Sequence, residues 1–202
     1  MENISQNIHD SFFKERVKGV MVEVGAAGPT YLSQSLYFRN KGWRCICIEP
    51  NPNFVKKHIE EGSEIYEYAC SDKDENNVDF EICNMGGEVT NESFSSLDIQ
   101  ESFVKKSGFS SKTNLNIEKI KVNIRKLDTI LNTLNISSID YISIDVEGHE
   151  QKVLDGFSIQ KYKPKIVLIE NNYEDDRYDN YFKLNNYSLY SNNGNNYIYK
   201  LI

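Results

Sequence analysis

The feature that most constrains this chain is a recurring unit in which a short apolar run ends at an acidic or polar residue and a segment with helical spacing follows. This alternation is typical of parallel βαβ units with buried strands. It predicts strands at residues 19–24, 44–48, 64–70, 141–144 and 166–169, and helices at about 32–40, 53–61, 127–134, 150–157 and 175–184. Two runs around Gly194, residues 187–190 and 197–201, predict a terminal hairpin. The predicted class is α/β, with a doubly wound parallel sheet and a C-terminal antiparallel hairpin.

The regular pattern is interrupted between residues 83 and 116. Strands are expected on either side, at 78–82 and 119–124, but the intervening sequence is rich in Ser, Gly and Asn and has scattered aromatic residues, Phe94, Phe103 and Phe109. Long segments without regular structure inside a compact domain are usually functional. We predict that residues 83–116 form a lid over the bound substrate, called the acceptor below. The alternative is that they form a surface loop without a role in function.

The length of 202 residues favours one domain over residues 1–202, with residues 1–18 as a helical N-terminal extension. The 30 acidic and 23 basic residues give a net charge of −7, which argues against a nucleic-acid partner. No apolar run is long enough to span a membrane, and the first ten residues do not resemble a signal peptide. We therefore expect a soluble, cytoplasmic protein. Its four cysteines do not suggest a disulfide framework.

The turn after the first strand reads Gly25-Ala26-Ala27-Gly28-Pro29. A glycine turn between a buried strand and a helix lets a ligand approach the backbone, but this one lacks the G-x-G-x-x-G spacing of dinucleotide sites. Glu23 lies inside the strand, where a carboxylate suits a ligand with an ammonium group such as S-adenosylmethionine. Glu49 ends the second strand, near the spacing of a ribose-binding acid. The alternative is that these residues only end strands and make a turn.

A dense acidic centre follows the strand at 141–144, where Asp145, Glu147, His149 and Glu150 occur within six residues. An acid here can accept from a ligand ammonium, hold a divalent cation or orient a base. His149 can take a proton from an alcohol, because an unperturbed imidazole has a pKa near 6.5. The alternatives are a solvent-exposed His149 and a Glu150 that only favours the start of a helix.

Glu170 and Asn171 end the strand expected beside this one. Together with Asp145 they offer hard oxygen ligands, which predicts a possible Mg²⁺ site. Glu170 could equally contact the acceptor or a backbone N–H.

Over about residues 18–172 the chain resembles the FkbM family of S-adenosylmethionine-dependent methyltransferases. The most specific stretch is residues 139–150 (IDYISIDVEGHE), which follow the segment 126–131 (KLDTIL). Residues 48–52 (IEPNP) match a second family motif, and residues 68–72 (YACSD) resemble a third. The chain departs from the family pattern at Pro29, where the family commonly has a glycine.

The resemblance implies a class I methyltransferase fold, with a seven-stranded sheet, and methyl transfer to a hydroxyl oxygen, often of a sugar. It also implies a cofactor site formed by Glu23, Gly25, Ala26, Ala27, Gly28, Glu49, Pro50, Asn51, Ala69, Cys70, Ser71, Asp72 and Asp145. Asp145, Glu147 and His149 are the candidates for catalysis. The expected partner is a small-molecule or glycan acceptor. The alternatives are a non-catalytic module that binds the cofactor or a glycan, and a nicotinamide oxidoreductase.

Overall fold

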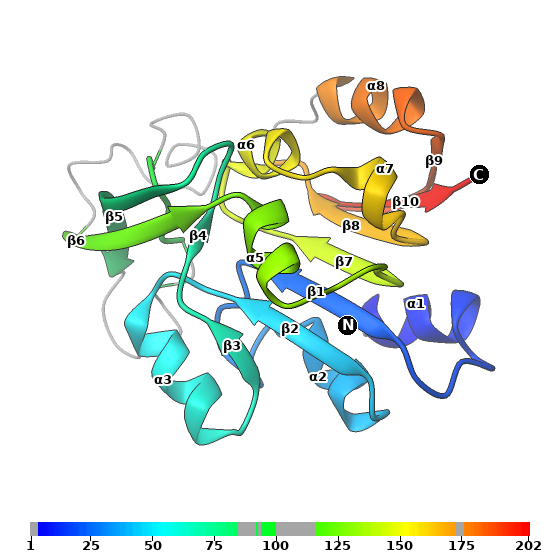
Figure 1. The fold of residues 1–202 in the computed structure, drawn as a ribbon, viewed down its shortest axis with the longest axis horizontal. Helices are drawn as coiled ribbons and strands as arrows, with labels where there is room; N and C mark the ends of the chain where they lie inside the picture. Colours follow the sequence, from blue (N-terminus) through cyan, green and yellow to red (C-terminus); the bar gives the residue numbers. More distant parts are fainter. Residues whose placement is uncertain (1–3, 85–91, 93, 100–115, 173–175) are drawn as a thin grey trace.

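The computed structural model describes residues 4–84, 92, 94–99, 116–172 and 176–202. Its main sheet has seven strands in the order β3-β2-β1-β7-β8-β10-β9 (Figure 1). The first five are parallel, and β10 is antiparallel to both of its neighbours. Their bounds are β1 Val20–Val24, β2 Arg44–Ile48, β3 Glu64–Tyr66, β7 Tyr141–Ile144, β8 Ile166–Glu170, β9 Tyr187–Asn193 and β10 Asn196–Leu201. This arrangement confirms the predicted parallel sheet and terminal hairpin.

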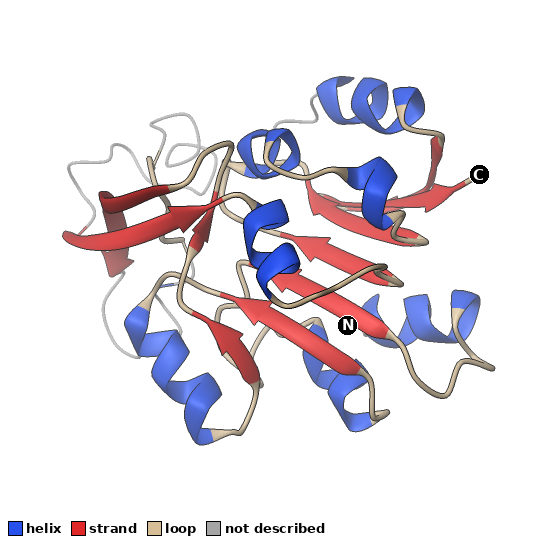
Figure 2. Cartoon of the chain, viewed as in Figure 1, coloured by secondary structure: helices blue, strands red, loops and turns tan. Residues whose placement is uncertain are grey.

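Helices cover both faces of the main sheet (Figure 2). Successive strand residues face opposite sides, so Met21 belongs to the buried cluster that includes residues of α1 and α2, while Val22 belongs to the cluster that includes residues of α5, α6 and α7. The helices are α1 Ile4–Phe12, α2 Ser35–Asn40, α3 Pro52–Glu60, α5 Leu127–Thr133, α6 Glu150–Asp155, α7 Ile159–Tyr162 and α8 Asp176–Leu184. None of these described helices is long and apolar enough to cross a membrane.

A second, smaller sheet has the order β4-β6-β5 and lies beside the carboxyl ends of the main strands (Figure 1). It consists of β4 Ala69–Cys70, β5 Glu75–Asn84 and β6 Asn116–Arg125, around a small core that includes Phe80 and Ile124. The prediction of one strand over residues 64–70 was therefore wrong, because the structure has two strands there, β3 and β4, in different sheets. The chain leaves the main sheet after Tyr66, whose carbonyl accepts from the Tyr68 N–H at 3.0 Å, and re-pairs with β6 at Ala69.

Helix α1, inside the expected N-terminal extension, packs on the main sheet next to α2. Its Ile8 joins Phe13, Phe38 and Trp43 in a buried cluster on that face. Arg16, just after this helix, forms an ion pair of 2.8 Å with Asp140, at the start of β7. All four cysteines are free and buried.

Candidate active site

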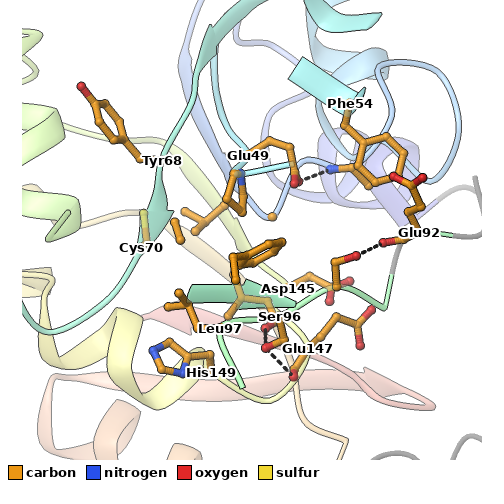
Figure 3. A pocket seen from close by; sticks show the side chains of 18 of the residues that line it. Glu49, Phe54, Tyr68, Cys70, Glu92, Ser96, Leu97, Asp145, Glu147 and His149 are labelled. Atoms are coloured by element: carbon orange, nitrogen blue, oxygen red, sulfur yellow. Dashed lines mark hydrogen bonds between the residues drawn. The ribbon is translucent and has the colours of Figure 1, made fainter. Parts of the chain in front are cut away.

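A pocket of about 740 Å³, partly open to solvent, lies where the carboxyl ends of β1, β2 and β7 meet the small sheet. Figure 3 shows Glu49 and Phe54 on one side and Asp145, Glu147 and Ser96 on another. The lining residues are Val24, Gly25, Ala27, Leu32, Glu49, Pro50, Phe54, Tyr68, Ala69, Cys70, Phe80, Glu92, Ser95, Ser96, Leu97, Asp145, Val146, Glu147 and His149. The carboxyl edge of a parallel sheet is where open α/β folds bind ligands.

The first turn depends on Gly25, which has φ +77°. A Cβ atom at this position would lie 1.7 Å from the backbone carbonyl oxygen of Asp145, so no other residue fits. The N–H groups of Gly25 and Ala26 donate to the carbonyl of Ile48, at 3.0 and 3.2 Å. These two N–H groups are therefore already hydrogen-bonded within the protein. Gly25 and Ala27 line the pocket, while Ala26 and Gly28 do not.

Glu49 is fixed in the pocket wall by two backbone donors. Its Oε2 accepts from the N–H of Ala27 at 2.9 Å (Figure 3). Its Oε1 accepts from the N–H of Asn51, also at 2.9 Å. Each carboxylate oxygen keeps a second lone pair for a ligand. Burial raises the pKa of Glu49 to about 7, against the lowering effect of these hydrogen bonds. Hydrogen bonds from ligand hydroxyls would favour the ionised form.

Glu23 lies outside the pocket lining, although sequence reasoning expected it at the ligand. Its carboxylate accepts from the N–H groups of Gln34 and Ser35, at 2.5 and 3.1 Å. The residue is buried, and burial raises its pKa to about 7. In this structure Glu23 holds the start of α2 against β1, and its contact with a ligand ammonium stays a prediction.

The acidic centre brings Asp145, Glu150 and Glu170 together, with carboxylate oxygens within 4.8 Å of one another. Glu150 is the structural member of this group. Its Oε1 accepts from the N–H groups of Val146 and Gly148, at 3.0 and 3.1 Å, and its Oε2 accepts from the Tyr178 hydroxyl at 3.3 Å. It therefore shapes the loop after β7, a role beyond the expected effect on the helix start.

Asp145 and Glu147 face the pocket from this loop. The Asp145 side chain is open to the pocket, yet desolvation by the surrounding walls raises its pKa, and one of its carboxylate oxygens lies within 4.8 Å of one from Glu170. Desolvation and the charge of Asp145 also raise the pKa of Glu170. Among the described residues, no Lys or Arg forms an ion pair with either group. This wall carries negative charge that only a proton or a ligand can neutralise.

Glu147 has a strained backbone, with φ +57°. Its Oε2 is shut off from solvent and has no hydrogen-bond partner among the described residues. Desolvation and the nearby charges of Asp145 and Glu150 raise its pKa well above the usual value. Strained backbone and unsatisfied acceptors are features of sites that are completed by a ligand.

His149 lines the opposite end of the pocket and is half-buried. Its Nε2 lies 3.1 Å from the Ser71 hydroxyl oxygen. Burial lowers the pKa of His149 below its usual range, so the imidazole is neutral at pH 7 and able to accept a proton. The structure therefore places it in the pocket and not on the open surface.

The other expected cofactor residues divide into two groups. Pro50, Ala69 and Cys70 line the pocket, whereas Asn51, Ser71 and Asp72 are not among its lining residues. Asn51 caps α3 by accepting from the N–H of Asn53 at 2.9 Å, and its amide donates to Glu92 at 2.8 Å. Asp72 forms an ion pair with Lys152 at 2.6 Å. These three residues support the walls.

Of the predicted lid, only residues 83, 84, 92, 94–99 and 116 lie within the described part of the chain. Phe103 and Phe109 are outside it. Ser96 pairs with Glu81 of β5, and its hydroxyl lies 3.4 Å from the carbonyl oxygens of Val146 and Glu147. Glu92, Ser96 and Leu97 thus help to line the pocket from within the predicted lid segment, although the sequence pattern did not single out these three residues.

The strand order, the antiparallel hairpin and the pocket at the carboxyl edge define a Rossmann-like fold of the methyltransferase type. The model of the methyltransferase FkbM domain matches residues 23–189 of the 202-residue chain. The chain belongs to the FkbM methyltransferase family. A comparison with curated proteins gave no match.

Proposed function

We propose that this methyltransferase uses S-adenosylmethionine to methylate a hydroxyl group, of a sugar or glycan. The observation that supports the proposal is the pairing of Glu49 with Asp145 and Glu147 on different walls of one pocket. One wall offers oriented carboxylate lone pairs to a ligand, and the other offers proton acceptors. The four free cysteines also fit a reducing compartment, and we propose the cytoplasm.

The residues present fit this cofactor. Glu49 would accept hydrogen bonds from the ribose hydroxyls, and the carboxylates of Asp145 and Glu147 would attract its positive charge. Phe54, Ala69 and Cys70 give an apolar surface for the adenine ring. The bound cofactor supplies an electrophilic methyl group on a sulfonium. Asp145 therefore has two roles in this proposal, one toward the cofactor and one toward the acceptor.

The chain's own contribution to catalysis is positioning and proton acceptance. Asp145, Glu147 and His149 are the groups that can take the proton of the acceptor hydroxyl at the pocket wall. His149 is neutral at pH 7, and the raised pKa of Asp145 makes its carboxylate a stronger base than an exposed one. Phe80 and Leu97 shield this wall from water.

A divalent cation is a further part of the proposal. Asp145 and Glu170 have the close carboxylate oxygens that Mg²⁺ prefers, and Glu150 adds a third, while Asn171 follows Glu170 directly. The N–H of Asn171 donates to the Asn195 carbonyl at 2.7 Å, which anchors this end of β8 to the hairpin turn. Loss of activity in EDTA and its recovery with Mg²⁺ would support the cation, and full activity in EDTA would remove it from the proposal.

The function is tested by incubating the purified protein with radiolabelled S-adenosylmethionine and a panel of sugars, and then measuring label in the acceptor. We expect transfer to a sugar hydroxyl that Asp145→Asn reduces strongly. Transfer to a non-sugar hydroxyl would change the acceptor class. Binding of S-adenosylhomocysteine without transfer to any acceptor would support a non-catalytic binding module instead.

A further inference from the structure

His58 of α3 is a buried histidine that the proposed chemistry does not use. Its Nε2 lies 3.1 Å from the backbone carbonyl oxygen of Ala27. A carbonyl oxygen can only accept, so Nε2 carries the hydrogen and donates it. Its Nδ1 is buried and has no partner among the described residues, which fits the unprotonated nitrogen of a neutral ring. Burial also lowers the pKa of His58, in agreement with a neutral imidazole.

The residue that His58 contacts is strained. Ala27 has φ +44°, a left-handed conformation that residues with a Cβ atom rarely adopt. Such a conformation persists only when neighbouring groups hold it. In this structure Ala27 is held on both sides, because its carbonyl accepts from His58 and its N–H donates to Oε2 of Glu49 at 2.9 Å.

We propose that His58 is a positioning residue that orients the carboxylate of Glu49 by holding Ala27 in its left-handed conformation. The proposal rests on the proposed function, in which Glu49 binds the ribose of the cofactor. If Ala27 relaxes to negative φ, its N–H turns away from Glu49 and one of the two backbone donors of the carboxylate is lost. Glu49 then has fewer constraints and a less stabilised charge.

The geometry separates this role from simple core packing. A histidine that only fills space contributes through its volume, so its replacement should change the affinity by the same factor whatever residue occupies position 27. A histidine that holds a strained residue is needed only while that residue is strained. Glycine adopts positive φ without steric cost, so Ala27→Gly should make the turn much less dependent on His58.

The experiment measures S-adenosylhomocysteine affinity by calorimetry for wild type, His58→Phe, Ala27→Gly and the double variant. We expect His58→Phe to weaken binding about tenfold relative to wild type, the scale of one lost hydrogen bond, and the double variant is compared with the Ala27→Gly single variant. In the Ala27→Gly background, His58→Phe should cost no more than about twofold. His9 is another buried histidine, located in α1, and His9→Phe serves as the control that leaves affinity unchanged.

Equal losses from His58→Phe in both backgrounds, or no loss in either, would overturn the positioning role. If His58→Phe does not fold, His58→Gln replaces it. The Gln amide keeps a donor but not the geometry of the ring, so we expect a smaller loss that Ala27→Gly also removes. An unchanged loss from His58→Gln in the Ala27→Gly background would again overturn the proposal. Absence of S-adenosylhomocysteine binding by folded wild-type protein would instead reject the proposed function.

Discussion

The carboxyl edge of the main sheet carries acidic residues in two adjoining places, called here the β1–β2 edge and the β7–β8 edge, and the protein treats them differently. At the β1–β2 edge, formed here by Glu23 and Glu49, two backbone N–H groups donate to each carboxylate. At the β7–β8 edge, formed by Asp145, Glu147 and Glu170, carboxyl groups face one another and no described Lys or Arg pairs with them. The first edge is already organised in the protein alone, whereas the second is completed by a proton, a cation or a substrate.

The difference shows that residue type and position at a strand end do not fix a residue's role. Glu23 lies inside β1 and accepts a hydrogen bond from the start of α2, which it holds in place. Glu147 has a strained backbone and faces the pocket. The two residues differ in whether backbone N–H groups donate to their carboxylates. The turn at residues 33–35 brings N–H groups to Glu23, and the loop after β7 gives its N–H groups to Glu150 instead of Glu147.

The largest effect is expected at Gly25, where the two edges touch. Gly25→Ala places a Cβ atom against the carbonyl of Asp145 and strains the backbone, so we expect a loss of about 3 kcal/mol or more in the free energy of unfolding. Urea denaturation measures it. The matched control is Gly28→Ala, because a Cβ there meets nothing closer than 3.7 Å, and a change below about 1 kcal/mol is expected. Similar stabilities for the two variants would show that the edges are not in contact at Gly25.

The next effect concerns the donors at the β1–β2 edge. Glu23→Leu leaves the N–H groups of Gln34 and Ser35 without their acceptor in a buried place, so we expect a loss of about 2 kcal/mol in stability. Thermal or urea unfolding measures the loss. An unchanged midpoint would mean that Glu23 does not hold the start of α2 and would weaken the contrast between the edges.

Stability should also fall as the pH rises. Burial raises the pKa of Glu23, Glu49 and Glu150 to about 7, above the value near 4.5 of the unfolded chain. The folded state therefore binds more protons than the unfolded state between these values, and the stability present below pH 4.5 is lost as the pH rises through 7. We expect the ligand-free protein to be less stable at pH 7.5 than at pH 5.5, on the order of 2 kcal/mol for each of these three groups.

Urea titrations at the two pH values measure this change. Exposed acids with lowered pKa values, such as Asp72 and Asp79, titrate below this window. His58 and His149, whose pKa values burial lowers, act in the opposite direction in the lower part of the window, but they are outnumbered by the buried acids with raised pKa values. A protein that gains stability between pH 5.5 and 7.5 would contradict the account of these buried acids.

The smallest effect belongs to the β7–β8 edge and has the opposite sign. Glu147→Gln removes a carboxyl group that burial and the charges of Asp145 and Glu150 make harder to ionise in the folded chain than in the unfolded chain, and Oε2 has no partner to lose among the described residues. We expect a gain of about 0.5 to 1 kcal/mol in stability at pH 8, with reduced activity. A loss of stability would show that Glu147 is tied into the structure as Glu23 is.

The regular part of this molecule could be predicted from the sequence because its signals are local. The apolar runs at 44–48 and 141–144 coincide with β2 and β7, and the acids that follow them do lie in the pocket. Two strands of the small sheet, β5 and β6, were predicted at 78–82 and 119–124, but β4 and the sheet itself were not, since β4 joins it through pairing with β6, about fifty residues away. The short helix α7 also gave no signal.

The role of each side chain was harder to predict than its place. The Asn51-Pro52 pair is a recognisable helix start, so the capping role of Asn51 had a signal that sequence reasoning did not use. Glu150 and Glu92 had none, because their partners come from other elements or from loop folding. Unsatisfied acceptors, such as Oε2 of Glu147, are visible only once the pocket is built.

The most direct test of the division between the edges compares Glu49→Ala with Asp145→Asn in two measurements on each variant, S-adenosylhomocysteine affinity and single-turnover methyl transfer at saturating cofactor. We predict that Glu49→Ala loses about 1 to 3 kcal/mol of binding and keeps most of its saturated rate. Asp145→Asn should keep more of its affinity but lose about 10² to 10⁴ in rate. Equal losses of affinity and rate in both variants, or an Asp145→Asn variant with the wild-type rate, would contradict the account.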